Sequence, residues 1–170
     1  MTVRIYITGG TFDKVYEPIS EKLDFTETHV PEILRNGRNR NKVELETLML
    51  KDSLYMTDAD RQHLLKKCQS CLEDKILITH GTGTMIETAR VLGENDQSLE
   101  DKTIVLLGAM VPYSVSDSDA IFNFAFAYGA VQSLSNGVYI NMNGKIFCRN
   151  NVRKNPETGE FEEINARTTA

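Results

Sequence analysis

Cysteine is scarce in the sequence, and its pattern excludes several kinds of site. The chain has three cysteines, an odd number, so a disulfide framework is not expected. Cys68 and Cys71 form a C-x-x-C pair within a helical pattern, but no second pair or nearby histidine completes a zinc site. We interpret both as reduced helix residues and expect no metal.

Long apolar segments and a targeting sequence are also missing. No segment is long and apolar enough to cross a bilayer. The N-terminus has the composition of a β-strand and lacks the basic-then-apolar order of a signal peptide. We therefore expect a cytoplasmic protein with no membrane partner.

Positive charge is in the minority. The 19 lysines and arginines face 24 acidic residues, which gives a net charge of -5. Nucleic-acid-binding proteins usually carry a basic patch, so no nucleic-acid partner is expected. The phosphate-binding patterns G-x-G-x-x-G and G-x-x-x-x-G-K-[ST] are absent too, which makes a nucleotide- or flavin-binding protein a distant alternative. We expect no organic cofactor.

What the sequence does contain is an alternation of strand and helix patterns. Strand patterns cover residues 3–8, 43–50, 75–79 and 103–108, and helical patterns cover 30–35, 57–72, 85–92 and 119–134. Asn143-Gly144 marks the turn of a hairpin over residues 137–148. This order predicts an α/β fold for residues 1–170 as a single domain: a three-layer, doubly wound, mostly parallel sheet of flavodoxin or Rossmann type with a C-terminal β-hairpin.

Two polar segments lack a clear period. Residues 13–28 form a long stretch that we interpret as a functional or mobile loop. The tail from Asn150 is also polar, and we expect its last residues to be disordered.

Two glycine–threonine turns follow predicted strands. Gly9-Gly10-Thr11 ends the first strand and His80-Gly81-Thr82 ends the third. Ligands of parallel sheets bind at the carboxyl ends of the strands, where both hydroxyls should lie. Threonine is a poor nucleophile without a base or cation beside it, and Tyr16, Lys14 and the lysines of the tail are candidates for that role. One such turn is commonly structural, but two favour chemistry.

These motifs resemble those of the bacterial L-asparaginases. The resemblance rests on Thr8-Gly9-Gly10-Thr11, Thr79-His80-Gly81-Thr82 and Gly108-Ala109-Met110, and it continues through Asp119, Phe122-Asn123, Gly137-Val138 and Met142-Asn143. Full-length members of that family have a second, C-terminal domain. The chain therefore looks like a short, single-domain form equivalent to their N-terminal domain.

The resemblance implies a role for each matching residue. Thr11 would attack the side-chain amide of L-asparagine, form an acyl-enzyme and release ammonia, with Tyr16 as its helper. Thr82 would work with a lysine, for which Lys154 is the match, although Lys145 and Arg153 lie near it in the sequence. The residues expected to bind substrate are Gly10, Asp52, Ser53, Gly81, Gly83, Ala109 and Met110.

Two positions depart from the family pattern. The family usually has an aspartate at Gly83 and a polar residue at Leu54, and both serve the substrate α-ammonium. Other acids, such as Asp13, Glu17 or Asp117, or a neighbouring subunit, would then have to meet the ammonium. Otherwise the substrate is not a free α-amino acid, or the protein is a non-catalytic binding module for a small amide or carboxylate.

The remaining candidates have structural interpretations. We expect His80 to make structural hydrogen bonds at its turn rather than to act as a base. The aromatic run Phe122, Phe124, Phe126 and Tyr128 should pack on the sheet or form an oligomer interface. The resemblance also implies a homodimer or higher homo-oligomer.

Overall fold

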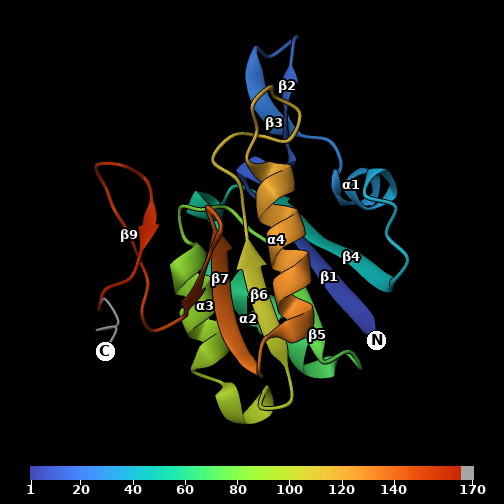
Figure 1. Ribbon diagram of the computed structural model, residues 1–170. Coiled ribbons are helices and arrows are strands. Elements are labelled where there is room, and N and C mark those ends of the chain that lie inside the picture. The colour runs from blue at the N-terminus through green and yellow to red at the C-terminus, as the bar shows by residue number, and fades with distance from the viewer. Residues whose placement is uncertain (166–170) are drawn as a thin grey trace.

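Six strands form the central sheet of the computed structural model, which describes residues 1–165 (Figure 1). They are β1 (Thr2–Gly9), β4 (Lys42–Lys51), β5 (Lys75–Thr79), β6 (Thr103–Leu107), β7 (Gly137–Met142) and β8 (Lys145–Cys148). The order across the sheet is β4-β1-β5-β6-β7-β8. All neighbouring pairs are parallel except β7 and β8, which form an antiparallel hairpin at one edge. The predicted doubly wound, mostly parallel sheet is thus confirmed.

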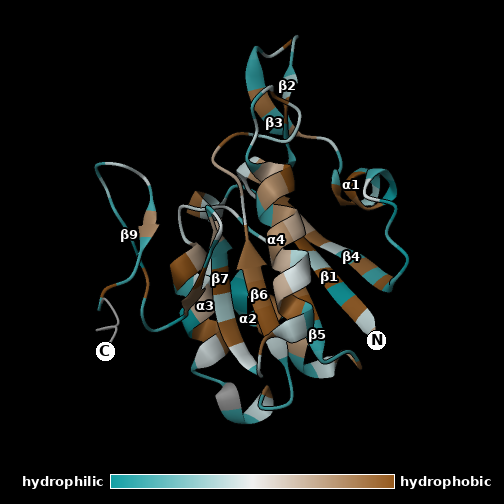
Figure 2. Ribbon diagram, in the orientation of Figure 1, coloured by the Kyte–Doolittle hydropathy of each residue, from teal (hydrophilic) through white to brown (hydrophobic). Residues whose placement is uncertain are grey.

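Helices cover both faces of the sheet and make it the middle of three layers. Helices α2 (Asp58–Ser70) and α3 (Met85–Gly93) pack on one face, while α1 (Val30–Asn36) and α4 (Ala120–Ser133) pack on the other, with α4 in front in Figure 1. Successive strand residues point to opposite faces, so Ile76 and Ile78 join the core under α2 and α3, and Leu77 joins the other core. Burial on both faces explains why β6 is mostly apolar in Figure 2.

Local sequence signals define several element ends. The Thr57 hydroxyl accepts a hydrogen bond from the Asp60 backbone N–H, and the Asp60 carboxylate accepts one from the Thr57 N–H, so a capping box starts α2 as predicted. At the β7–β8 turn, Asn143 and Gly144 both have positive φ, at 54° and 73°. That pair of angles is typical of a tight type I′ hairpin turn.

Helix α4 divides its aromatic run between core and surface. Phe124 is buried against Phe12, with ring centroids 6.2 Å apart, whereas Phe122 and Phe126 are exposed.

Cys68 and Cys71 are both free thiols in this structure. Within the described residues, no helix combines the length and apolarity needed to cross a membrane.

The two polar segments differ from their predicted form. Residues 14–25 are not a loop but an antiparallel hairpin of β2 (Lys14–Glu17) and β3 (Lys22–Phe25), which projects beyond the sheet (Figure 1). The tail also forms a hairpin, of β9 (Arg153–Lys154) and β10 (Phe161–Glu162). Most residues of these strands are at least partly exposed, and each strand has only two or four residues, which is too short for a sustained apolar alternation to mark it in the sequence. The expectation of disorder falls on the last residues of the chain, outside the described ones.

Candidate active site

The two glycine–threonine turns meet backbone against backbone. Gly10 has a φ of 75°, and a Cβ atom placed on it would lie 2.3 Å from the backbone nitrogen of Gly81. The Gly10 N–H also donates to the carbonyl of Lys51, at the end of β4, over 2.9 Å. Glycine is required at Gly10 for both the φ angle and the close approach, which brings the ends of β1, β4 and β5 together.

Thr11 begins a single 3-10 turn, η1 (Thr11–Asp13), that is anchored from below. Phe12 is fully buried in the core under α1 and α4, and Asp13 is fully buried beside it. Thr11 itself is partly exposed, and its hydroxyl has no hydrogen-bond partner among the described residues. The anchored turn therefore presents a free hydroxyl at the carboxyl edge of the sheet.

Thr82 and Lys154 form a direct pair across 72 residues of sequence. The Lys154 ammonium donates to the Thr82 hydroxyl over 3.0 Å. Burial lowers the pKa of Lys154 below its ordinary value, and the ammonium lies 5.9 Å from the centre of the Phe161 ring. The alternatives point elsewhere: Lys145 is exposed on β8, and Arg153 is paired with Glu162. The structure thus brings together the two residues that the resemblance suggested.

Ser53 reaches the same place from the end of β4. The Asp52 carboxylate caps the 3-10 turn η2 (Ser53–Tyr55) by accepting from the Leu54 N–H over 3.0 Å. Ser53 is 4% exposed, and its Oγ would be 2.4 Å from a Cβ atom placed on Gly81. A side chain at Gly81 would therefore displace the serine hydroxyl from the turn.

Asp52 is engaged on its other oxygen. It pairs with Lys14 at the start of β2, and the Lys14 ammonium holds the pKa of Asp52 below its usual range. The sequence made Lys14 a candidate activator of Thr11, but in the structure Lys14 forms its ion pair with Asp52. The ion pair ties the projecting hairpin to the Ser53 turn.

Gly83 and Leu54, the two positions that depart from the family pattern, are neighbours in the structure. A Cβ atom on Gly83 would lie 2.9 Å from Leu54 Cδ2 and 3.1 Å from Ser53 Oγ. Leu54 is 71% exposed, so it stands at the surface beside Ser53. The leucine occupies the space that a side chain at Gly83 would need, and the wall of the site at this point is apolar.

Ala109 and Met110 follow the end of β6. Ala109 is fully buried, whereas Met110 is exposed, and its N–H donates to the Asp119 carboxylate over 3.0 Å. Asp119 stands at the start of α4, so this bond fixes the loop after β6. Met110 Cε lies 3.3 Å from the Cβ position of Gly159 in the tail hairpin.

Tyr16 makes no hydrogen bond to Thr11 in this structure. Its side chain is 59% exposed on β2, and it forms no hydrogen bond or ion pair with the part of the chain that the structure describes. The hairpin that carries it extends away from the sheet edge (Figure 1).

The sequence did not predict that Asp13 is a buried, hydrogen-bonded carboxylate. It is enclosed, not on a mobile loop, and Oδ1 accepts from the Thr28 hydroxyl over 3.0 Å and from the His29 N–H over 3.1 Å. Burial raises the pKa of Asp13 to about 6. The carboxylate joins the two ends of the β2–β3 hairpin and has no exposed surface in this structure.

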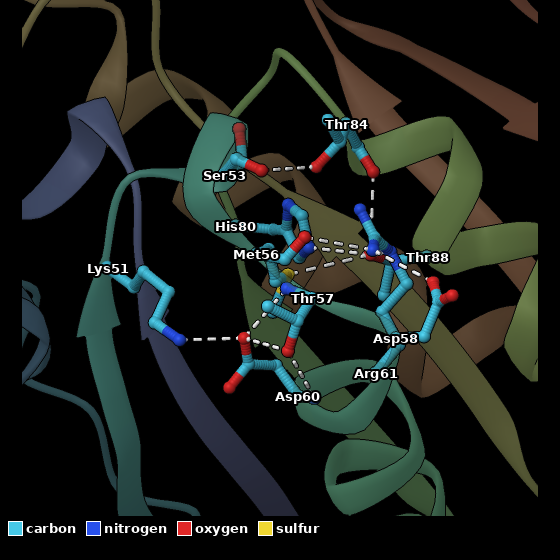
Figure 3. A network of polar contacts seen from close by, with 10 residues as sticks. All are labelled: Lys51, Ser53, Met56, Thr57, Asp58, Asp60, Arg61, His80, Thr84 and Thr88. Carbon is cyan, nitrogen blue, oxygen red and sulfur yellow. Dashed lines mark hydrogen bonds and ion pairs between the residues drawn. The ribbon is translucent and has the colours of Figure 1, made fainter.

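His80 makes the structural hydrogen bonds that were expected of it. Its Nδ1 lies 2.8 Å from the Gly81 carbonyl. Its Nε2 lies 2.8 Å from the Thr88 hydroxyl (Figure 3). Burial lowers the pKa of His80 to about 4, so the ring is neutral near pH 7.

Comparison with known proteins identifies the family of the chain. The family model of the asparaginase N-terminal domain matches residues 2–168. The chain is 27% identical to the probable periplasmic L-asparaginase of Haemophilus influenzae, covering 92% of the chain and 47% of that protein. It is 30% identical to L-asparaginase 2 of Escherichia coli strain K12, covering 80% and 39%. The chain therefore spans about half the length, or less, of these relatives.

Solved structures show the same fold. The thermostable L-asparaginase from Thermococcus kodakarensis superposes with a TM-score of 0.81 at 24% identity, covering 97% of this chain and 52% of that one. The probable cytoplasmic L-asparaginase from Campylobacter jejuni gives a TM-score of 0.72 at 27% identity, covering 90% and 48%. The chain belongs to the asparaginase family, whose N-terminal domain it matches over nearly its whole length.

Proposed function

We propose that the protein is a cofactor-free amidohydrolase that converts L-asparagine to L-aspartate and ammonia through a threonine acyl-enzyme. The observation that carries the proposal is the Lys154–Thr82 hydrogen bond, formed on a turn that packs directly against the Thr11 turn. Burial lowers the pKa of Lys154, and a lysine amine of lowered pKa beside a hydroxyl can act as a proton acceptor. Membership of the family supports the same reaction class.

In the proposed mechanism Thr11 is the nucleophile. Its oxygen attacks the amide carbonyl carbon, the new C–O bond forms, the C–N bond breaks, and the proton lost by the hydroxyl leaves with the nitrogen as ammonia. Water then attacks the ester, which releases the acid and restores the hydroxyl. A neutral Lys154 amine accepts the Thr82 proton, and Thr82 in turn accepts the proton of the attacking group.

The surroundings of the reacting atoms assist this chemistry. Helix α3 begins at Met85, just after the Thr82 turn, so its free N–H groups and dipole favour negative charge there. Ser53, held against Gly81, is proposed to bind the substrate carboxylate together with the turn residues Gly10, Gly81 and Gly83. Tyr16 is proposed to join Thr11 when the β2–β3 hairpin closes over bound substrate.

Thr11→Val tests the nucleophile. We expect ammonia release to fall by at least about 10³-fold, since removal of a nucleophile disables the whole catalytic unit. The matched control is Thr47→Val, an exposed residue of β4, which should leave turnover and stability nearly unchanged. Undiminished turnover in Thr11→Val, with the control also active, would refute the assignment.

The contact between Leu54 and Gly83 favours a second candidate substrate. Leu54 offers no polar partner to an ammonium group at this point, and an ammonium that bound substrate removes from water without a partner is destabilised by several kcal/mol. An amide that lacks the free α-ammonium avoids this cost. Ammonia release from L-asparagine and from succinamate, its analogue without the amine, separates the two. Calorimetric binding of either compound without turnover would instead indicate a non-catalytic binding module.

We also propose a cytoplasmic homo-oligomer, with a dimer as the simplest form. Helix α4 contains no charged residue, and Ile121, Phe122 and Phe126 on it are exposed. Contiguous exposed apolar residues are typical of interaction surfaces. Light scattering that shows a monomer at working concentration would exclude the oligomer, and fractionation of cells would test the location.

A further inference from the structure

Arg61 is a buried cation that the proposed mechanism does not use. It lies on α2 and is 7% exposed. Its Nε donates to the Thr88 hydroxyl over 3.2 Å and its Nη1 donates to the Met56 carbonyl over 3.1 Å. Its nearest carboxylate is that of Asp58, 3.6 Å away, on a side chain that is fully exposed. Figure 3 shows the guanidinium aimed inward, toward Thr88 and the His80 ring.

The hydrogen bonds around His80 have one consistent direction. The Gly81 carbonyl can accept only, so His80 Nδ1 carries the proton of the neutral ring and donates it over 2.8 Å. His80 Nε2 is then an acceptor, and the Thr88 hydroxyl donates a hydrogen bond to it over 2.8 Å. The Thr88 oxygen in turn accepts from Arg61. The chain therefore runs from Arg61 through Thr88 and His80 to the Gly81–Thr82 turn.

We infer that Arg61 is a positioning residue that acts through Thr88 and His80 to fix the turn carrying Thr82. The inference rests on the proposed function of Thr82 and Lys154. Because arginine stays protonated, its Nε always donates, which leaves the Thr88 proton free to serve His80. The Thr88 hydroxyl has two further acceptors within reach in the same structure, at 3.4 Å in the Thr84 carbonyl and at 3.8 Å in Met56 Sδ, and the bond from Arg61 orients the Thr88 oxygen so that its proton points to His80.

The consequence of losing the network is a misplaced hydroxyl. If Thr88 turns away, His80 Nε2 loses its proton donor, and the tautomer that holds Gly81 is no longer preferred. The turn then loses the bond that orients it, and Thr82 shifts relative to Lys154. Displacements near 1 Å at a catalytic group reduce turnover by about 10²-fold.

The test compares two substitutions of Thr88 and two of Arg61. Thr88→Ser keeps the hydroxyl and should retain turnover near that of the unaltered protein. Thr88→Val removes the hydroxyl at nearly equal volume and should lower kcat by about 10- to 100-fold with little change in KM. Arg61→Met should resemble Thr88→Val, and Arg61→Lys should fall between. The imidazole ¹⁵N shifts of His80 should show a single Nδ1–H tautomer in the unaltered protein and in Thr88→Ser, but a mixture in Thr88→Val.

Leu65→Ala is the structural control. It lies on α2 and is buried in the core but has no hydrogen bond to the network, so it should lower stability without altering the His80 tautomer or the kcat of the folded protein. The inference is overturned if Thr88→Val matches Leu65→Ala in kcat, in tautomer and in the amide shifts of Gly81 and Thr82. These NMR readouts need no turnover. Absence of ammonia release in every variant would therefore reject the proposed function, while the tautomer and amide shifts would still decide whether the network sets the turn.

Discussion

Asp13 illustrates how one buried carboxylate makes stability depend on pH. Its pKa is raised to about 6 because burial disfavours the charged form, against about 3.9 in an unfolded chain. A raised folded-state pKa means that stability is fully present below pH about 4 and is lost as the pH rises through about 6. The difference corresponds to about 3 kcal/mol.

Asp13→Asn should remove this dependence. Asparagine keeps an oxygen that can accept from Thr28 and His29 but cannot ionise. We expect the variant to be more stable above pH 6, by up to about 3 kcal/mol, and to show a flat stability profile between pH 4 and 7 at this site. Urea unfolding at several pH values measures it. A variant less stable than the unaltered protein at pH 8 would show that the carboxylate charge is needed.

Lys154 should control the alkaline side of activity. Its pKa is lowered by burial, so the neutral amine becomes available at a lower pH than in an exposed lysine. We expect kcat/KM to rise with pH as the amine deprotonates. Lys154→Met should abolish that rise and reduce turnover by about 10²–10³-fold, on the scale of one lost electrostatic contact. Lys145→Met, on the exposed edge of β8, is the matched control and should keep both.

The turns that meet at the site pack so closely at Gly10 that no residue with a side chain fits there. Gly10→Ala would place a methyl group 2.3 Å from the Gly81 nitrogen at a φ of 75°. Backbone strain alone is on the order of 1–3 kcal/mol, so we expect marked destabilisation and loss of turnover. Gly129→Ala is the contrast, since nothing lies within 4 Å of its Cβ position on α4. That variant should gain up to about 1 kcal/mol from helix propensity. Thermal unfolding of both variants tests the pair, and equal effects would contradict it.

Element prediction succeeded where burial imposes a period and failed where it does not. The central strands lie between two cores, so β5 and β6 read as short, mostly apolar runs, and each helix packs against one of these cores. The β2–β3 and β9–β10 hairpins have largely exposed strands, and the contacts that hold them have no local period. Asp13 clamps the base of the first, and Phe161 anchors the second in the core.

At the scale of the whole molecule, the tail hairpin depends on one aromatic anchor. Phe161 is 3% exposed, pairs in register with Lys154 and packs against Phe147 with ring centroids 6.5 Å apart. Phe161→Ala should destabilise the protein by about 3–5 kcal/mol and weaken catalysis, because Lys154 loses the surface that supports it. Leu72→Ala, at a residue 97% exposed, should change stability by no more than about 0.5 kcal/mol. Urea unfolding together with ammonia release measures both, and full activity in folded Phe161→Ala would contradict the support role.

Features set by neighbouring residues could be predicted from the sequence, whereas contacts between residues far apart in the sequence could not. The sequence by itself determined the α/β class, the parallel order of its strand signals and the placement of Thr11 and Thr82 after strands, because these depend on local period and on turn residues. Only the tertiary structure decided that Lys154 rather than Lys145 or Arg153 meets Thr82, and that Leu54 fills the space beside Gly83. It also decided that Lys14 serves Asp52 and that Arg61 reaches His80 through Thr88. Each of these contacts joins different elements, and packing, which no local pattern encodes, selects the partner.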